Sequence, residues 1–308
     1  MSLFELRNMV PGDRDEIARL IYHSTNRYYV SIGHPPLFTG DELSAGVFFD
    51  VYERMDPGRG LVAVDRRSGR IIGSCFVHPR ETHVSLGIRN VHPERFRQGV
   101  AKGLLQAIIG VARSAGRPLR LVSSCLNLDS YSLYTRAGLV PYCTYQDLYL
   151  SIPAGGLPFA PPAGVAVREA VMEDVEAMAS IEQEVSGITR VGDYRYFLRN
   201  AEGFWHVSVV EGANGLDGFL VSCGAQALNM LGPGVARTQE QAAALIHAEL
   251  NRHPGRSPLM VVPVACGDLV RQLYAWGARN CELHVGQALG HVQAPRGVTM
   301  PSYLPESG

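Results

Sequence analysis

The sequence predicts an α/β (α+β) fold built from two related domains, each with a mixed, mostly antiparallel sheet flanked by helices. Three observations lead to this prediction: the length of the chain, an internal repeat, and a segment rich in proline and glycine between the two copies. A chain of 308 residues is about two domains' worth of sequence. A hydrophobic fraction of 46% allows each half to bury a core of its own.

The internal repeat starts at the beginning of each half. Arg7 is followed by Asp13 in the first copy, and Arg168 is followed by Asp174 in the second. The offset is constant, because 168 − 7 and 174 − 13 both equal 161. Each start is typical of a short strand, an aspartate at a helix start, and then an amphipathic helix. Both copies continue into a predicted β-hairpin.

The segment between the copies contains four prolines and three glycines within residues 153–164. Such a composition does not sustain a helix or a central strand, so we predict a linker there. The predicted organisation is therefore an N-terminal domain at 1–152, the linker at 153–164, and a C-terminal domain at 165–308.

Composition excludes several classes of protein. A net charge of −1 gives no electrostatic reason to expect nucleic acid or an anionic membrane as a partner. No apolar run approaches the length of a membrane helix, and the start of the chain does not resemble a signal peptide. The six cysteines lack a C-x-x-C spacing, which favours reduced thiols over disulfides or zinc. We expect a cytoplasmic protein.

The most informative stretch lies between residues 91 and 105. It predicts a strand end, a short loop containing Gly99, and a helix with apolar periodicity. A helix that opens on such a loop presents unpaired backbone N–H groups and the positive end of its dipole, which together form an anion site. The residues expected around the anion are Arg97, Gln98, Gly99, Val100, Ala101 and Lys102.

A second motif, Asn127–Leu139, follows a predicted strand at residues 119–122. With both motifs in this order, the chain resembles the GNAT acyltransferase superfamily, here as a tandem of two GNAT-like domains. The phosphate loop of that family has the form Arg/Gln-x-x-Gly-x-Gly/Ala, which falls on Phe96, Gly99 and Ala101. The leading basic residue is thus replaced by Phe96, with arginines on either side.

The resemblance implies an N-acetyltransferase that uses acetyl-CoA as co-substrate, with Val91 and its neighbours along the pantetheine arm of the cofactor. The acceptor would be an amine of a small molecule or of a protein, and the active site would lie in the N-terminal domain. Tyr134 would be the general acid that protonates the leaving thiolate; the alternative is a core aromatic with a satisfied hydroxyl. Asn127 is expected as a helix cap or a cofactor contact, and Tyr131 as a lining residue of the cofactor groove or a surface residue.

The sequence offers several candidates for the general base. Family members often use a glutamate on the strand before the phosphate loop, and the predicted strand at 82–91 contains none. His83 is the candidate, since an imidazole can accept an ammonium proton near neutral pH. His78, His92 and Glu81 are alternatives. These histidines lie on different predicted elements without a paired ligand spacing, so no metal site is predicted.

The second copy is expected to be degenerate. Its equivalent of the phosphate loop is Leu231–Ala236, where Pro233 removes a backbone donor, and the following helix is expected to start late, with Thr238 as its cap. This half would shape the acceptor pocket or form a homodimer. The alternative for the whole chain is a non-catalytic protein that binds or senses acyl-CoA.

Overall fold

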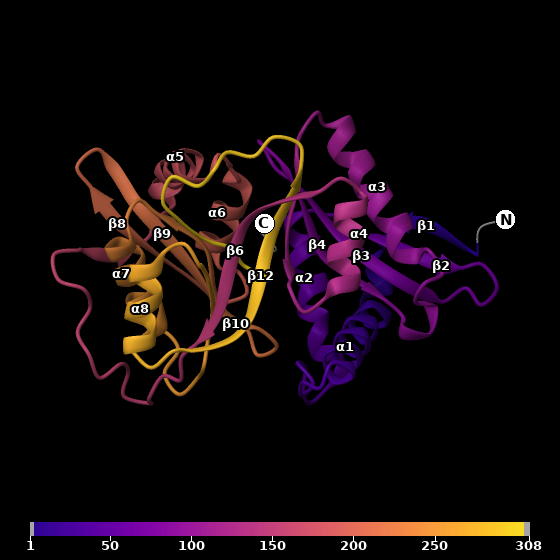
Figure 1. Cartoon of the computed structure of the whole chain (residues 1–308), viewed down its shortest axis with the longest axis horizontal. Coiled ribbons are helices and arrows are strands. Elements are labelled where there is room, and N and C mark those ends of the chain that lie inside the picture. Colours follow the sequence, from indigo (N-terminus) through magenta and orange to yellow (C-terminus); the bar gives the residue numbers. More distant parts are fainter. Residues whose placement is uncertain (1–2, 305–308) are drawn as a thin grey trace. The chain divides into compact units, whose positions relative to one another are not determined.

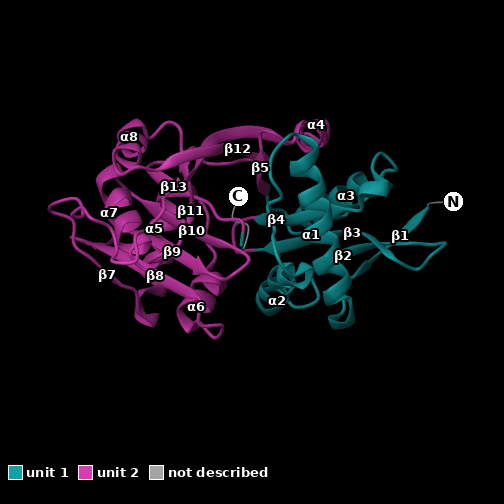
Figure 2. Cartoon of the chain, turned by 90° about the horizontal axis from the view of Figure 1, so that it is seen from below, with its two compact units in different colours: residues 1–79, 84–119, 304–306 teal, residues 80–83, 120–303, 307–308 magenta. Residues whose placement is uncertain are grey.

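The computed structural model describes residues 3–304. The chain divides into two compact units, coloured separately in Figure 2. Among the described residues, the first unit contains 3–79, 84–119 and 304, and the second contains 80–83 and 120–303. Each unit is a sheet flanked by helices, as Figure 1 shows, and the pairing of strands is mostly antiparallel. The predicted fold class is confirmed.

The first unit has the sheet order β1-β2-β3-β4, with antiparallel pairing throughout. Its elements are β1 (Phe4–Asn8), α1 (Arg14–Ser31), α2 (Gly46–Met55), β2 (Leu61–Asp65), β3 (Ile71–Pro79), β4 (Val84–Val91) and α3 (Val100–Ser114).

The core of the first unit follows directly from sequence periodicity. The apolar residues of α3 recur three or four positions apart, which places them on one face of the helix. That face is buried against the sheet, and the predicted stripe is confirmed at Leu104, Leu105, Ile108, Ile109 and Ala112. Strand β3 is buried along nearly its whole length, because helices cover both faces of the sheet.

The second unit has the sheet order β5-β12-β6-β11-β10-β9-β8-β7, and β13 pairs with β10. Its elements are β5 (Leu119–Ser124), α4 (Leu128–Arg136), β6 (Val140–Tyr149), β7 (Val167–Glu169), α5 (Val175–Ser186), α6 (Val191–Arg199), β8 (Trp205–Gly212), β9 (Gly215–Gly224), β10 (Asn229–Ala236), α7 (Gln239–Leu250), β11 (Leu259–Pro263), α8 (Gly267–Ala275), β12 (Arg279–Leu289) and β13 (Val298–Met300).

The two copies exchange their last strands within the second unit. Strand β6 ends the first copy, yet it lies between β11 and β12 of the second and pairs antiparallel with both (Figure 1). Strand β12 in turn lies between β5 and β6 of the first copy. The compact units therefore divide after residue 119, whereas residues 153–164 connect β6 to β7 without a helix or strand. The division into 1–152, the linker and 165–308 stays a prediction about the repeats.

The internal repeat is visible in side-chain geometry. Arg7 Nη1 lies 2.6 Å from Asp13 Oδ2, and the Val10 N–H donates to the same carboxylate. In the second copy, Arg168 Nη1 lies 2.7 Å from Asp174 Oδ2, which again accepts from the N–H three residues earlier. The hydrogen bond from Arg7 is the main reason why the pKa of Asp13 is lowered.

One prediction for the second copy is wrong. Leu231–Ala236 is not a loop, because it lies inside strand β10. One edge of β10 pairs with β11 at Leu231, and further along the same strand β13 pairs with residues 234–236. A glycine-rich segment can extend into a strand where other backbone approaches closely. Here a Cβ on Gly232 would lie 2.6 Å from the carbonyl oxygen of Pro301.

Candidate functional site

The start of α3 has the geometry of an anion site. Gly99 caps the helix with φ +84°, a conformation that glycine adopts without strain. The first helical hydrogen bond runs from the Gly103 N–H to the Gly99 carbonyl, so the three N–H groups before Gly103 precede the helical ladder. Within residues 3–304, no hydrogen bond is found for the N–H groups of residues 97–102.

The loop before α3 is held by its own side chains. Arg95 pairs with Asp65 at 2.9 Å, and Gln98 Nε2 donates to the Glu94 carbonyl at 3.0 Å. Arg97 and Lys102 are exposed, and neither pairs with an acidic residue in the described part of the chain. The predicted residues therefore have different roles. The side chain of Gln98 stabilises the loop, whereas the charges of Arg97 and Lys102 are exposed and can face an anion.

Strand β4, which precedes this loop, has an irregular pairing with β3. Cys75 and Val77 of β3 are two positions apart, whereas their partners on β4, Arg89 and Leu86, are three apart. The additional residue makes a bulge in β4, which interrupts the regular ladder and re-aims the backbone. Val91, beyond the bulge, still pairs with β3.

The second motif lies in the second unit. Asn127 caps α4, since its Oδ1 accepts from the Ser130 N–H at 3.0 Å. The cap interpretation of Asn127 is thereby confirmed. Tyr131 is half-buried one turn into the helix, and Tyr134 is 5% exposed. The roles of these three residues toward a cofactor stay predictions.

His83 does not lie on a strand, contrary to the prediction. Strand β4 begins at Val84, and His83 belongs to the preceding turn, where its carbonyl accepts from the Arg80 N–H at 2.8 Å. Its side chain is almost fully buried. His78, an alternative base, is equally buried, and its Nδ1 lies 2.6 Å from Asp56 Oδ2. Neither role as a base is tested by these contacts.

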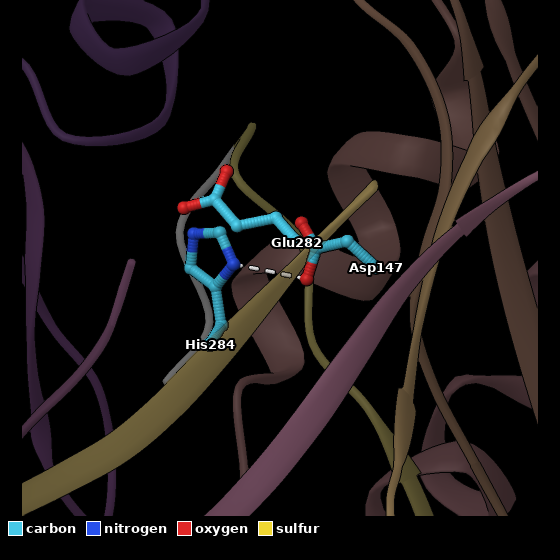
Figure 3. A group of neighbouring side chains, drawn as sticks. All are labelled: Asp147, Glu282 and His284. Carbon is cyan, nitrogen blue, oxygen red and sulfur yellow. Dashed lines mark hydrogen bonds and ion pairs between the residues drawn. The ribbon is translucent and has the colours of Figure 1, made fainter. Parts of the chain in front are cut away.

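Sequence reasoning missed a cluster formed by Asp147, Glu282 and His284 (Figure 3). One carboxylate or imidazole atom from each residue lies within 4.8 Å of the others. Burial, followed by the charges of Asp147 and Glu282, raises the pKa of the neighbouring Cys281 thiol to about 11. The signal available in the sequence was the E-x-H spacing on β12, but its partner is 135 residues away from Glu282 (282 − 147).

The corresponding helix start in the second copy is closed. Thr238 Oγ1 accepts from the Gln241 N–H, and Gln241 Oε1 accepts from the Thr238 N–H at 3.0 Å. This reciprocal capping box satisfies donors that would otherwise be free. The predicted late start of this helix, after a Thr238 cap, is confirmed.

The start of α3 fits the diphosphate of a coenzyme A ester. A Cβ built on Gly99 meets no atom within 4 Å, so an anion can approach the backbone closely there. Unpaired N–H groups, a helix dipole and two exposed cations supply the charge.

Among the described helices, none is long and apolar enough to cross a membrane.

Part of the chain matches a known protein family. Residues 21–139 match the sequence model of the acetyltransferase (GNAT) family. A search among curated proteins found no match. The matched segment includes the loop before α3 and both Asn127 and Tyr134.

Several solved structures share the fold. A Pyrococcus horikoshii protein assigned as an acetyltransferase is 16% identical, with a TM-score of 0.75 over 99% of this chain and 96% of its own. A GCN5-related N-acetyltransferase from Sphaerobacter thermophilus is 16% identical, with a TM-score of 0.64 over 94% and 96%. A tandem GNAT protein from the clavulanic acid biosynthesis pathway is 16% identical, with a TM-score of 0.61 over 93% and 98%. At these identities the likeness shows the fold alone.

Proposed function

We propose that this protein is an acetyl-CoA-dependent N-acyltransferase that transfers an acetyl group to an amine of a small molecule or a protein. The observation that carries the proposal is the open start of α3, where backbone donors and exposed cations remain without partners in the described chain. The family match over residues 21–139 supports acyl transfer in general.

Each proposed residue has a physical task. The N–H groups from Gly99 to Lys102 bind the diphosphate, and Arg97 adds charge. Asn127 fixes the start of α4, which carries Tyr131 and Tyr134. Tyr134 donates a proton to the leaving thiolate. The coenzyme supplies the activated acetyl group when bound.

The second copy is proposed to bind no acetyl-CoA. Its helix start is capped by Thr238 and Gln241, and β13 pairs with β10 next to it. This half would instead shape the acceptor pocket or form a homodimer. We further propose that the protein acts in the cytoplasm without a nucleic acid partner.

The test combines binding and turnover. Calorimetry with coenzyme A should give one site per chain, and thiol release from acetyl-CoA should appear with some member of a panel of primary amines. Tyr134→Phe should lower turnover by about one to three orders of magnitude, with little change in coenzyme A affinity. Binding with no turnover across the panel would favour an acyl-CoA sensor, and absent binding would refute both functions.

A further inference from the structure

The loop before α3 contains a residue in an unusual backbone conformation. Arg97 has φ +62°, and within residues 3–304 Asn200 is the only other residue besides glycine with a positive φ. Residues with a Cβ rarely adopt this left-handed conformation, because the Cβ crowds the following carbonyl oxygen. Such a conformation persists where the surrounding contacts hold it, and it is frequent at ligand-binding loops. The contacts that hold Arg97 therefore bear on the anion site.

The left-handed residues of this loop decide where the N–H groups at the start of α3 point. Arg97 and Gly99 both have positive φ, and the right-handed helix begins at Val100. A left-handed residue followed by a right-handed one turns successive N–H groups into one concavity, and such concavities bind anions. The anion site thus depends on the conformation of the loop as well as on the helix.

Asp65, at the end of β2, is fixed by the turn that follows it. Its Oδ1 accepts from the N–H groups of Arg67 and Ser68 at 2.9 and 2.8 Å, a pattern typical of an aspartate that closes a turn. Its Oδ2 lies 2.9 Å from Arg95 Nη2, and the Asp65 side chain is 5% exposed. The hydrogen bond from the Ser68 N–H is the main reason why the pKa of Asp65 is lowered, so the carboxylate is ionised at neutral pH.

The ion pair of Asp65 and Arg95 reaches both sides of Arg97. Arg95 precedes Arg97 by two positions, and its Nη1 lies 3.5 Å from Oε1 of Gln98, the residue after Arg97. Gln98 Nε2 in turn donates to the Glu94 carbonyl at 3.0 Å. These contacts close the loop around Arg97, whose own side chain is exposed. A buried carboxylate on the sheet therefore holds the segment in which the left-handed residue lies.

We propose that Asp65 is a positioning residue for the cofactor. Through Arg95 it holds Arg97 in the left-handed conformation, which turns the N–H groups at the start of α3 toward the diphosphate. The two arginines beside Phe96 then have different tasks: Arg95 fixes the loop, and Arg97 faces the anion. This inference rests on the proposed function, and it explains how a loop with Phe96 in place of the leading basic residue can still bind a diphosphate.

A different role for Arg95 predicts the opposite sign. If Arg95 bound the diphosphate directly, the Asp65 carboxylate would compete for the same guanidinium. Removing the negative charge of Asp65 would then strengthen anion binding. If Asp65 positions the loop, its removal weakens binding, because the loop has to be ordered when the anion binds. The direction of the change therefore separates the two roles.

The binding test is Asp65→Asn. The amide oxygen of asparagine can still accept from the turn, while its NH2 group would face the donors of Arg95. We expect the dissociation constant of coenzyme A, measured by calorimetry, to rise about tenfold. The matched control is Asp217→Asn, because Asp217 pairs with Arg237 directly before α7, with Oδ1 and Nε 3.0 Å apart. This control should leave the affinity within about twofold of the wild type.

A mutant cycle tests whether Asp65 acts through Arg95. Arg95→Gln should weaken binding as much as Asp65→Asn, and the double variant should be no weaker than either single one. Both losses should persist in high salt, whereas the loss in Arg97→Gln should shrink, because an exposed charge is screened. All affinities are measured well below the melting temperature of each variant. A carboxylate that only stabilised the fold would leave them unchanged.

A spectroscopic test is independent of turnover. In the free protein, the Cα and Cβ chemical shifts and the HN–Hα coupling of Arg97 report its φ. The wild type and Asp217→Asn should show the left-handed conformation, and Asp65→Asn should lose it. Inorganic diphosphate should shift the amide signals of residues 99–102 in the wild type, and Asp65→Asn should need about tenfold more of it for the same shift.

Two results would overturn the assignment. The first is unchanged or tighter coenzyme A binding in Asp65→Asn, and the second is a left-handed Arg97 in that variant. If Asp65→Asn does not fold, Arg95→Gln decides in the same way, since it leaves the turn after β2 intact. If the wild type binds inorganic diphosphate but not coenzyme A, the proposed function fails, while the response of Asp65→Asn to diphosphate still decides the role of Asp65. A wild type that binds neither would refute both.

Discussion

The helices α3 and α7 occupy equivalent places in the two copies, and their first turns differ in how their donors are satisfied. At α3, Gly99 leaves the N–H groups without partners in residues 3–304. At α7, Thr238 and Gln241 cap each other, and the preceding Arg237 N–H donates to the Asp217 carbonyl at 2.9 Å.

A few residues at the start of a helix therefore decide whether its backbone N–H groups stay open, as at α3, or are satisfied within the chain, as at α7. A helix that starts at a glycine with unpaired N–H groups is less stable than a capped helix, but these N–H groups can bind an anion. A helix that starts with a capping box is more stable, but its N–H groups are already paired and are not open to an anion. The following predictions test whether this contrast separates a working site from a structural copy.

The largest effect is expected at Gly99. Gly99→Glu should weaken coenzyme A binding by at least ~100-fold, because a carboxylate would enter the anion site. The matched control is Gly116→Glu at the far end of the same helix, where glycine also has positive φ (+63°) and open space. Calorimetry with both variants measures the difference. Equal, undiminished affinities would show that the diphosphate binds elsewhere.

The next effect concerns the strand that pairs with β10. A Cβ on Gly297 would lie 2.4 Å from the Ala236 carbonyl oxygen, so Gly297→Ala should force β13 away from β10. We expect a loss of about 1–3 kcal/mol in the free energy of unfolding, measured in urea. Gly155→Ala, which meets no atom within 4 Å, is the control. If Gly297→Ala bound a second molecule of coenzyme A, the proposed contrast between the starts of α3 and α7 would be wrong.

A smaller effect is expected from the cations beside α3. The double change of Arg97 and Lys102 to alanine should weaken coenzyme A binding by about tenfold at low ionic strength, and by less in high salt, because exposed charges are screened. Arg113→Ala, in the last turn of the same helix, should leave affinity nearly unchanged. A salt-independent loss would argue that the two side chains act through packing instead.

The smallest effect is expected at the capped start of α7. Thr238→Ala should cost about 1 kcal/mol of stability through loss of the cap. Coenzyme A affinity should remain that of the wild type, since α7 is not a binding element in this proposal. Chemical denaturation and calorimetry measure the two quantities, and reduced affinity in this variant would assign a binding role to the second copy.

The sequence predicted the features that depend on local chemistry. The stripe on α3 and the caps at Asn127 and Thr238 are set by residues within a few positions of each other. Such features can be predicted from hydrophobic periodicity and from the residue preferences at helix caps. The same rules misplaced His83 by extending a strand through a turn.

Features that depend on distant pairing were missed. The cluster of Asp147 and His284 exists because β6 and β12 pair, and nothing local to either strand marks its partner. The glycines of β10 suggested a loop, whereas their function is to admit neighbouring backbone, such as that of Pro301. Whether Arg97, Tyr131 and Tyr134 act on a cofactor stays a prediction, since the roles proposed for them need a bound complex.

The exchange of β6 and β12 has a practical consequence for anyone dissecting this molecule by truncation. A fragment ending at residue 152 would carry β6 without either of its neighbours, and a fragment starting at 165 would lack the strand that fills its own sheet. Unprotected strand edges recruit other chains, so both pieces should aggregate or pair when produced separately. Mixing the two fragments after separate production should not restore the sheet, because β6 has to pair with β11 and β12 as the chain folds. Co-expression of the two fragments is therefore the way to split the chain.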